Sequence, residues 1–279
     1  MASTPLESIR HLIIDMDGVL YRGNRLMPGA DRLLPWLDQH GIKYVLVTNN
    51  SSRTPSQYAE KLRRMGLVVP PGLVLTSSQA TASYLQRVAE EGDRVYCIGE
   101  DGLRQALAQA GFEFSEVDPS YVVVGLDTGF TYEKLKRACL AIRAGAGFIA
   151  TNPDLTFPGE EGILPGCGSL IAAIQACTGV APKVIGKPEP GLLQAAMDMM
   201  ASQAENTAIL GDRLDTDVLG GHRLGVTTIL ILSGVSRPED AASATVKPDY
   251  VFWDLLELMR SFSVPAVSPP KKTIWRRKS

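Results

Sequence analysis

Residues 11–23 read HLIIDMDGVLYRG, a run of apolar residues that ends abruptly in two acids, Asp15 and Asp17, followed by Gly18. Such a run predicts a buried strand. Side chains alternate along a strand, so a spacing of two returns both acids to one side of its end. Two carboxylates at that place can serve as nucleophile and general acid. The alternative is an Asp that caps the next turn, which explains one acid more readily than the pair.

Three further apolar segments also end in polar residues. They are KYVLVTNNS, which ends in Thr48, Asn49 and Asn50; KVIGKPEP, which brings Lys187; and TAILGDRLDTD, which ends in Asp212, Asp215 and Asp217. In an open parallel sheet, ligands bind beyond the carboxyl ends of the strands. Four such ends could therefore meet at one site, with carboxylates for a cation and with hydroxyl, amide and ammonium groups for an oxyanion.

Strands alternate with helices along the chain, which predicts an α/β fold with a doubly wound, Rossmann-like parallel sheet. A first set of units has strands near residues 12–15, 43–48 and 74, and helices near 29–40 and 55–65. A second set follows, with strands near 94–98, 121–125 and 148–150 and helices near 102–110, 132–143 and 169–177. One continuous sheet would separate Lys187 from Thr48 by several strands. We therefore expect a core of residues 1–77 and 183–264 and an inserted α/β domain of residues 78–182.

Composition favours an intracellular enzyme. The 279 residues suffice for two domains, and a net charge of −2 with mixed signs gives no general attraction to nucleic acid or membrane. The sequence lacks a membrane-length apolar stretch and a signal peptide, so we expect a cytoplasmic protein. The four cysteines show no CxxC spacing, which argues against zinc and disulfides. The basic tail of residues 265–279 is expected to be disordered.

The order of these motifs resembles the haloacid dehalogenase superfamily of phosphohydrolases. Within it, the chain is similar to subfamily IIA, which holds NagD, 4-nitrophenylphosphatases, phosphoglycolate phosphatase and chronophin. The segments that carry the resemblance are DMDGVLYRG, VTNNSSRT, ATNPDLTFP, LPGCGSL, GKPEP and GDRLDTD, within residues 10–264. The resemblance implies a Rossmann-like core with an inserted cap of the C2 type.

The resemblance also implies roles for the acids. Asp15 would attack phosphorus and form an aspartyl-phosphate. Asp17 would protonate the leaving alcohol and later deprotonate water, a second acid that a dehalogenase does not need. Mg²⁺ would be held by Asp15, Asp212 and the backbone carbonyl of Asp17. Asp217 would hold the waters of the metal or orient Lys187, whereas Asp215 fits better as a helix cap or surface acid.

The phosphoryl group would be bound by the residues after the second strand and by the lysine. Thr48, Asn49 and Asn50 supply hydrogen-bond donors next to a helix that is expected to begin near Pro55. Lys187 supplies a point charge to the phosphate and to Asp15. Taken singly, a strand threonine, a loop lysine and a turn acid are ordinary; taken jointly, they indicate a site.

Substrate choice is expected to depend on the inserted domain. Asn152, Asp154 and Phe157 of ATNPDLTFP are candidates for contacts with the leaving group, and plain turn chemistry is an equal alternative. Chronophin-like relatives carry a histidine where this chain has Phe157, so specificity for pyridoxal phosphate does not transfer.

The predicted function is Mg²⁺-dependent hydrolysis of small phosphomonoesters such as 4-nitrophenyl phosphate, phosphoglycolate or nucleoside monophosphates. Two alternatives stay open at this point: transfer of the phosphoryl group to an acceptor alcohol, and a non-catalytic module that binds phosphometabolites. A homodimer through the cap is a further expectation.

Overall fold

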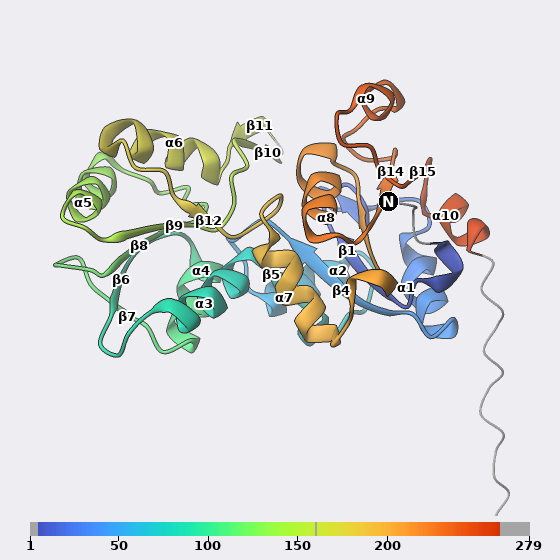
Figure 1. Ribbon diagram of the computed structural model, residues 1–279, viewed down its shortest axis with the longest axis horizontal. Coiled ribbons are helices and arrows are strands. Elements are labelled where there is room, and N and C mark those ends of the chain that lie inside the picture. Colours follow the sequence, from blue (N-terminus) through green and yellow to red (C-terminus); the bar gives the residue numbers. More distant parts are fainter. Residues whose placement is uncertain (1–4, 160, 263–279) are drawn as a thin grey trace, which may run out of the picture.

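The computed structural model describes residues 5–159 and 161–262, and its strands form two parallel sheets in separate lobes (Figure 1). The six-stranded sheet has the order β15 (Tyr250–Phe252), β14 (Thr227–Ile231), β13 (Thr207–Gly211), β1 (His11–Asp15), β4 (Lys43–Thr48) and β5 (Val74–Thr76). The five-stranded sheet has the order β12 (Lys183–Val184), β9 (Gly147–Ala150), β8 (Tyr121–Val124), β6 (Arg94–Ile98) and β7 (Glu113–Phe114). The α/β fold with a doubly wound parallel core is therefore confirmed.

Strand β1 is buried on both faces, as its continuous apolar sequence predicts. Leu12 and Ile14 point into one apolar cluster, whereas Ile13 points into a second cluster on the other face. In the register of the sheet, Ile13 lies beside Val45 of β4 and Ile209 of β13, which share its face. The alternation places Asp15 on the same face as Ile13.

Helices cover both faces of the six-stranded sheet. The helices that supply apolar side chains to the cluster of Leu12 are α1 (Ala30–Gln39), α2 (Pro55–Arg64) and α10 (Leu255–Ser261). Those that supply the cluster of Ile13 are α3 (Ser77–Val88), α4 (Asp101–Gln109) and α7 (Pro190–Met200). Two short helices, α8 (Leu219–Leu224) and α9 (Pro238–Ser243), follow later in the chain.

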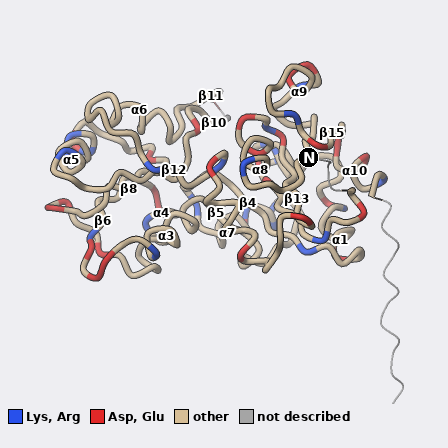
Figure 2. Tube along the Cα trace, in the orientation of Figure 1, with Lys and Arg blue, Asp and Glu red and all other residues tan. Residues whose placement is uncertain are grey.

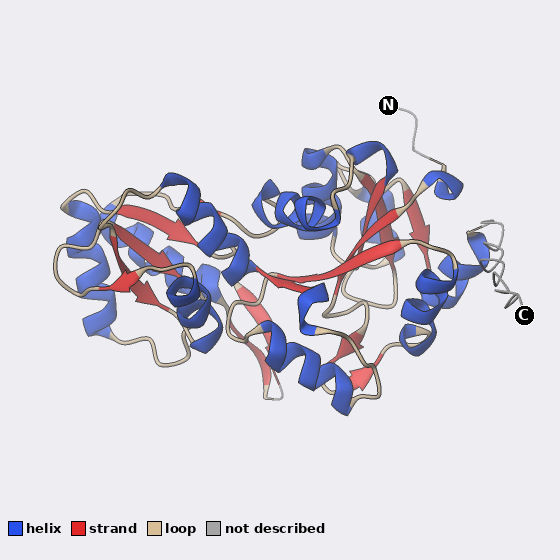
Figure 3. Cartoon of the chain, turned by 90° about the horizontal axis from the view of Figure 1, so that it is seen from below, coloured by secondary structure: helices blue, strands red, loops and turns tan. Residues whose placement is uncertain are grey.

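The two sheets share one of these apolar clusters. Val95, Cys97, Val123 and Ile149 of the five-stranded sheet lie in the same cluster as Ile13 of β1. Helices α5 (Tyr132–Arg143) and α6 (Cys167–Thr178) cover the opposite face of the five-stranded sheet (Figure 1). Figure 3 shows helices beside the strands of both lobes. The lobes are thus joined by packed side chains as well as by the connecting segments.

Most expected elements lie within two residues of their observed bounds. Helix α2 begins at Pro55 as expected, because Thr54 and Gln57 form a reciprocal capping box at its amino end. Two hairpins were not anticipated: β2 (Tyr21–Arg22) with β3 (Arg25–Leu26), and β10 (Thr156–Gly159) with β11 (Gly162–Pro165).

The return of the chain from the second lobe differs from the expectation. Lys183 and Val184, assigned from the sequence to the resumed core, pair with β9 of the five-stranded sheet. Strand β12 has only two residues, which is too short to show a periodicity. Because Ile185 follows it directly, the sequence does not mark where the strand ends. The expected tail of residues 265–279 lies outside the described residues.

Strand order reverses at β1, because β4 and β5 lie on one side of it and β13, β14 and β15 on the other. Such a switch point leaves a crevice at the carboxyl ends of the strands, where Asp15, Thr48 and Asp212 lie. Charges of both signs are interspersed over the chain (Figure 2). Among the described residues, no helix is long and apolar enough to cross a membrane.

Candidate active site

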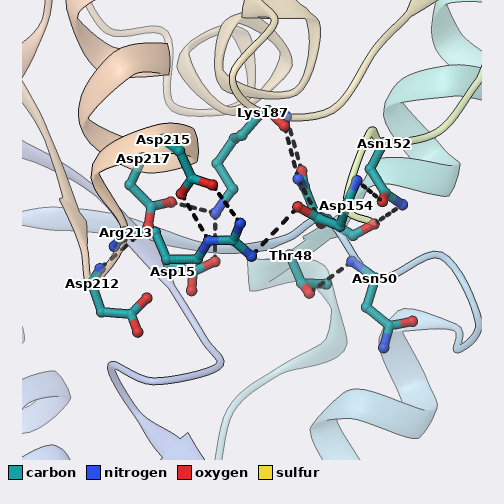
Figure 4. Close-up of polar contacts among 11 residues, drawn as sticks. Asp15, Thr48, Asn50, Asn152, Asp154, Lys187, Asp212, Arg213, Asp215 and Asp217 are labelled. Carbon is teal, nitrogen blue, oxygen red and sulfur yellow. Dashed lines mark hydrogen bonds and ion pairs between the residues drawn. The ribbon is translucent and has the colours of Figure 1, made fainter. Parts of the chain in front are cut away.

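Asp15, Lys187 and Asp217 form a buried ion cluster at the carboxyl end of β1 (Figure 4). The Lys187 ammonium lies 2.5 Å from Asp15 Oδ1 and 2.6 Å from Asp217 Oδ1. Lys187 lies three residues before the start of α7, which packs on the face of the sheet that Asp15 shares with Ile13. Burial lowers the pKa of Lys187, but the two carboxylates outweigh it and raise this pKa above its ordinary value.

Asp212 lies against two glycines that leave room for its carboxylate. A Cβ atom added to Gly18 would lie 2.0 Å from Asp212 Oδ2, and one added to Gly234 would lie 2.1 Å from the same oxygen. Gly18 also has a φ of +84°, which disfavours any other residue. Asp212 Oδ2 accepts a hydrogen bond from the Val235 amide at 2.8 Å. The loops after β1 and β14 thus close around one carboxylate.

Carboxylate oxygens of Asp15, Asp212 and Asp217 lie within 4.8 Å of one another, which suits a metal ion. When the three acids are ionised, they and the Lys187 ammonium together carry a net charge of −2. Asp212 Oδ1 is buried and finds no hydrogen-bond partner in the described part of the chain. A divalent cation with oxygen ligands would satisfy this atom and neutralise the cluster, so the residues fit such an ion.

Asp17 lies beyond the strand end and has different surroundings. Its Oδ2 accepts a hydrogen bond at 3.1 Å from the hydroxyl of Tyr21, which is the first residue of β2. Burial raises the pKa of Asp17 above its ordinary value, against the opposing charges of Lys61 and Lys187. A carboxyl group that keeps its proton to a higher pH is suited to act as a general acid.

The residues after β4 have two kinds of partner. Thr48 is buried and lines the cavity, and its hydroxyl oxygen accepts a hydrogen bond from the Asn50 amide at 3.1 Å. The Asn50 side chain turns back to accept from Ser52. The Asn49 side chain bonds the backbone of Lys187, donating to its carbonyl at 2.9 Å and accepting from its amide at 2.8 Å. Asn49 therefore holds the lysine segment, a role that its place in the sequence does not reveal.

The inserted domain brings two of its three candidate residues to the cavity. Asp154 and Phe157 line it, whereas Asn152 is buried and outside the lining. Asn152 donates to the Asn49 carbonyl at 2.8 Å, and Asp154 accepts from the Asn49 side chain at 3.0 Å. Asn152 thus connects the second lobe to the residue that follows β4 in the first lobe.

Arg213 was missed in the sequence. Its guanidinium lies between Asp154 of the second lobe, at 3.5 Å, and Asp215, at 2.7 Å. Asp215 is exposed and pairs with Arg213, in line with the expectation of a surface acid. The signal for Arg213 was its place as the one cation within GDRLDTD, among three acids.

The cavity above these residues has a volume of about 420 Å³ and is lined by both lobes. Its floor carries Asp15, Asp17 and Thr48, and Asp154 and Phe157 lie on the second-lobe side. Cavities of this size suit small-molecule ligands.

Comparison with protein-family models matches residues 12–113 to haloacid dehalogenase-like hydrolases and residues 184–258 to a HAD-hydrolase-like family. An acid sugar phosphatase of Staphylococcus aureus is 41% identical over 253 residues, which cover 90% of this chain and 97% of that protein. The chain belongs to the haloacid dehalogenase-like hydrolases. The two family-model matches include DMDGVLYRG, VTNNSSRT, GKPEP and GDRLDTD, and the resemblance to this family is confirmed.

Solved structures of HAD-like enzymes agree in fold. A 4-nitrophenylphosphatase from Thermotoga maritima has a TM-score of 0.87 and 39% identity, over 92% of this chain and 98% of that one. A glycerol phosphate phosphatase from Mycobacterium tuberculosis, in complex with magnesium, has a TM-score of 0.84 and 34% identity, over 94% of this chain and 78% of that one. The HAD-like chain is accordingly a phosphatase that acts on small phosphorylated substrates, in the subfamily that its motifs indicated.

Proposed function

We propose that the chain hydrolyses small phosphomonoesters through an aspartyl-phosphate on Asp15, with Mg²⁺ as its divalent cation. The observation that carries this proposal is the Asp15 carboxylate, buried at the cavity floor and held by Lys187 at 2.5 Å. The magnesium complex of the related glycerol phosphate phosphatase supports the choice of metal.

The first half of the reaction transfers the phosphoryl group to the enzyme. A carboxylate oxygen of Asp15 attacks phosphorus, and the bond from phosphorus to the ester oxygen breaks. The electron pair of that bond goes to the leaving oxygen, which takes the proton from Asp17. Thr48 and the backbone amide of Asn49 donate hydrogen bonds to the phosphoryl oxygens, whose charge must be balanced throughout.

The second half returns the enzyme to its starting state. Asp17, now ionised, removes a proton from water as its oxygen attacks phosphorus, and the bond to Asp15 breaks to release phosphate. Lys187 holds the carboxylate of Asp15 in place, and Asp217 orients the lysine. Bound Mg²⁺, held by Asp15, Asp212 and the carbonyl of Asp17, would neutralise charge on the phosphoryl oxygens.

The decisive test is release of phosphate from 4-nitrophenyl phosphate with and without Mg²⁺. Asp15→Asn removes the nucleophile, so we expect kcat to fall by at least about a thousandfold. Asp198→Asn is the matched control, because this acid is exposed on α7, lies outside the cavity lining and accepts from the Gln194 side chain. Release that does not depend on Asp15 would refute the mechanism.

A second readout separates hydrolysis from transfer. With glycerol added as acceptor, a hydrolase releases one phosphate for each 4-nitrophenol. An excess of 4-nitrophenol over free phosphate would identify a phosphotransferase instead.

A further inference from the structure

Two cations of the cavity lining, Arg53 and Lys61, make no salt bridge within the described part of the chain. Arg53 precedes α2 and is exposed, and Lys61 lies within α2 and is half-buried. The Lys61 ammonium sits over the Tyr21 ring, 3.8 Å from its centroid. Among the residues that the structure describes, neither cation makes a hydrogen bond or a salt bridge through its side chain.

The other cations of the cavity are all engaged. Arg22 donates to the Gly234 carbonyl at 2.8 Å. Arg213 pairs with Asp215 at 2.7 Å, and Lys187 with Asp15 at 2.5 Å. Arg53 and Lys61 therefore differ from the other cations of the cavity lining, because no salt bridge or side-chain hydrogen bond of the described residues engages them.

Lys61 lies next to the general acid of the proposed mechanism, and Arg53 lines the same cavity. The ring beneath Lys61 belongs to Tyr21, whose hydroxyl donates to Asp17 at 3.1 Å. Since Asp17 protonates the leaving oxygen in the proposed mechanism, its neighbours border the leaving group.

The two cations also act on each other. Burial lowers the pKa of Lys61, Asp17 opposes this effect, and the charge of Arg53 adds to it. Two like charges beside a partly desolvated site are unfavourable until an anion enters between them. An arginine offers paired donors to a carboxylate or phosphate, and a lysine adds a point charge.

We propose that Arg53 and Lys61 form a subsite for a second anionic group, a carboxylate or a phosphate, on the leaving group of the substrate. The proposal rests on the proposed function, which places the leaving group at Asp17. It narrows the substrate class to small phosphomonoesters whose alcohol is itself anionic. The cavity of about 420 Å³ has room for such a group beside the reacting phosphate.

The test compares substrates that differ only in this charge. One pair is 2-phosphoglycolate and its neutral amide; the other is propane-1,3-diyl bisphosphate and 3-hydroxypropyl phosphate. We expect kcat/KM to favour the charged member of at least one pair by about tenfold, the worth of one charge-assisted hydrogen bond. The two pairs distinguish a carboxylate from a phosphate, and equal rates within both pairs would overturn the proposal.

The variants Arg53→Gln and Lys61→Gln should each reduce this preference by about threefold to tenfold while sparing the neutral substrates. Arg64→Gln is the control, because Arg64 carries the same charge on α2 but pairs with Glu60 outside the cavity. It should leave the preference unchanged. An equal loss on charged and neutral substrates would show that the cations serve the reacting phosphate or steer all anions, and would refute the subsite.

Failure of the subsite and failure of the proposed reaction remain distinguishable. Hydrolysis of 4-nitrophenyl phosphate reports on the reaction alone. If no substrate is hydrolysed, calorimetric binding of the same pairs to Asp15→Asn with Mg²⁺ decides the question. Tighter binding of the charged member, weakened by Arg53→Gln, supports the subsite; equal or undetectable binding refutes it.

Discussion

Asp15 and Asp17 are two residues apart in sequence, yet their surroundings differ in a way that suits different tasks. Asp15 ends a strand and is held by the ammonium of Lys187. Asp17 lies in the following loop, where burial raises its pKa and Tyr21 donates to it. Burial raises the pKa of Asp15 as well, and the charge of Lys187 opposes that rise, so the ion pair favours the ionised Asp15 that a nucleophile needs.

The variant Asp17→Asn should separate the two chemical steps. Loss of the general acid costs about a hundredfold to ten-thousandfold with an alkyl phosphate, whose leaving group needs a proton. 4-Nitrophenolate leaves without one, so the first step should survive and the second should slow. We expect a stopped-flow burst of 4-nitrophenolate followed by slow turnover; equal losses on both substrates, without a burst, would contradict the assignment.

The side chain of Asn49 has a different role from the phosphate binding that its sequence position suggests. Its side chain bonds the amide and carbonyl of Lys187 and the carboxylate of Asp154. It therefore connects the end of β4 with the lysine segment and with the second lobe. Its backbone amide stays a proposed donor to the phosphoryl group.

Asn49→Ala should lower kcat by about tenfold to a hundredfold with a smaller change in KM, because the misplaced Lys187 ammonium acts on the reacting atoms. Gln194→Ala is the control, since this side chain is exposed on α7, lies outside the cavity lining and bonds Asp198. Steady-state kinetics on both variants measure the split. A change in KM alone would argue that Asn49 only binds substrate.

At the scale of elements, loops rather than strands determine where Asp212 points. Strand β13 delivers the residue, but the loops after β1 and β14 bring Gly18 and Gly234 against its carboxylate. A Cβ at either glycine would occupy the place of Asp212 Oδ2. Side chains of any size are therefore excluded at both positions.

Gly234→Ala should displace Asp212 and raise the Mg²⁺ concentration for half-maximal activity by at least about tenfold. Gly72→Ala is the control, because no atom lies within 4 Å of the added Cβ there. Activity titrations with Mg²⁺ give the comparison. An unchanged titration for Gly234→Ala would show that the loop yields and that Asp212 is not held as described.

At the scale of the whole molecule, the buried acids link metal binding, pH and stability. Burial, followed by the charge of Asp217, raises the pKa of Asp212 from 3.8 to about 7. Between these values Asp212 binds more protons in the metal-free folded protein than in the unfolded chain, so its contribution to the free energy of unfolding falls as pH rises. Mg²⁺ competes with these protons for the same carboxylates.

Mg²⁺ should therefore raise the melting temperature, and by more at about pH 8 than at about pH 5, where protons occupy the site. Differential scanning fluorimetry at both pH values, with and without Mg²⁺, measures this. Asp212→Asn should lose most of the increase. A melting temperature that does not change on addition of Mg²⁺ at either pH would count against the metal site.

The sequence by itself determined the sheet, the order of its motifs and the acids of the site. These features depend on local pattern: a continuous apolar run predicts a strand buried on both faces, and polar residues at its end predict a site at the sheet edge. The resemblance to the haloacid dehalogenase superfamily then supplied the reaction, and the comparisons confirmed that family.

Only the tertiary structure decided which side chains meet. The bonds from Asn49 to Lys187, the contact of Arg213 with Asp154 and the room that Gly234 leaves for Asp212 all join residues from different strand ends. Their distances depend on how the lobes pack through a shared apolar cluster and on loop conformations that have no periodic signature. For the same reason, the sequence alone does not show that Lys61 of α2 lies over Tyr21, whose hydroxyl donates to Asp17.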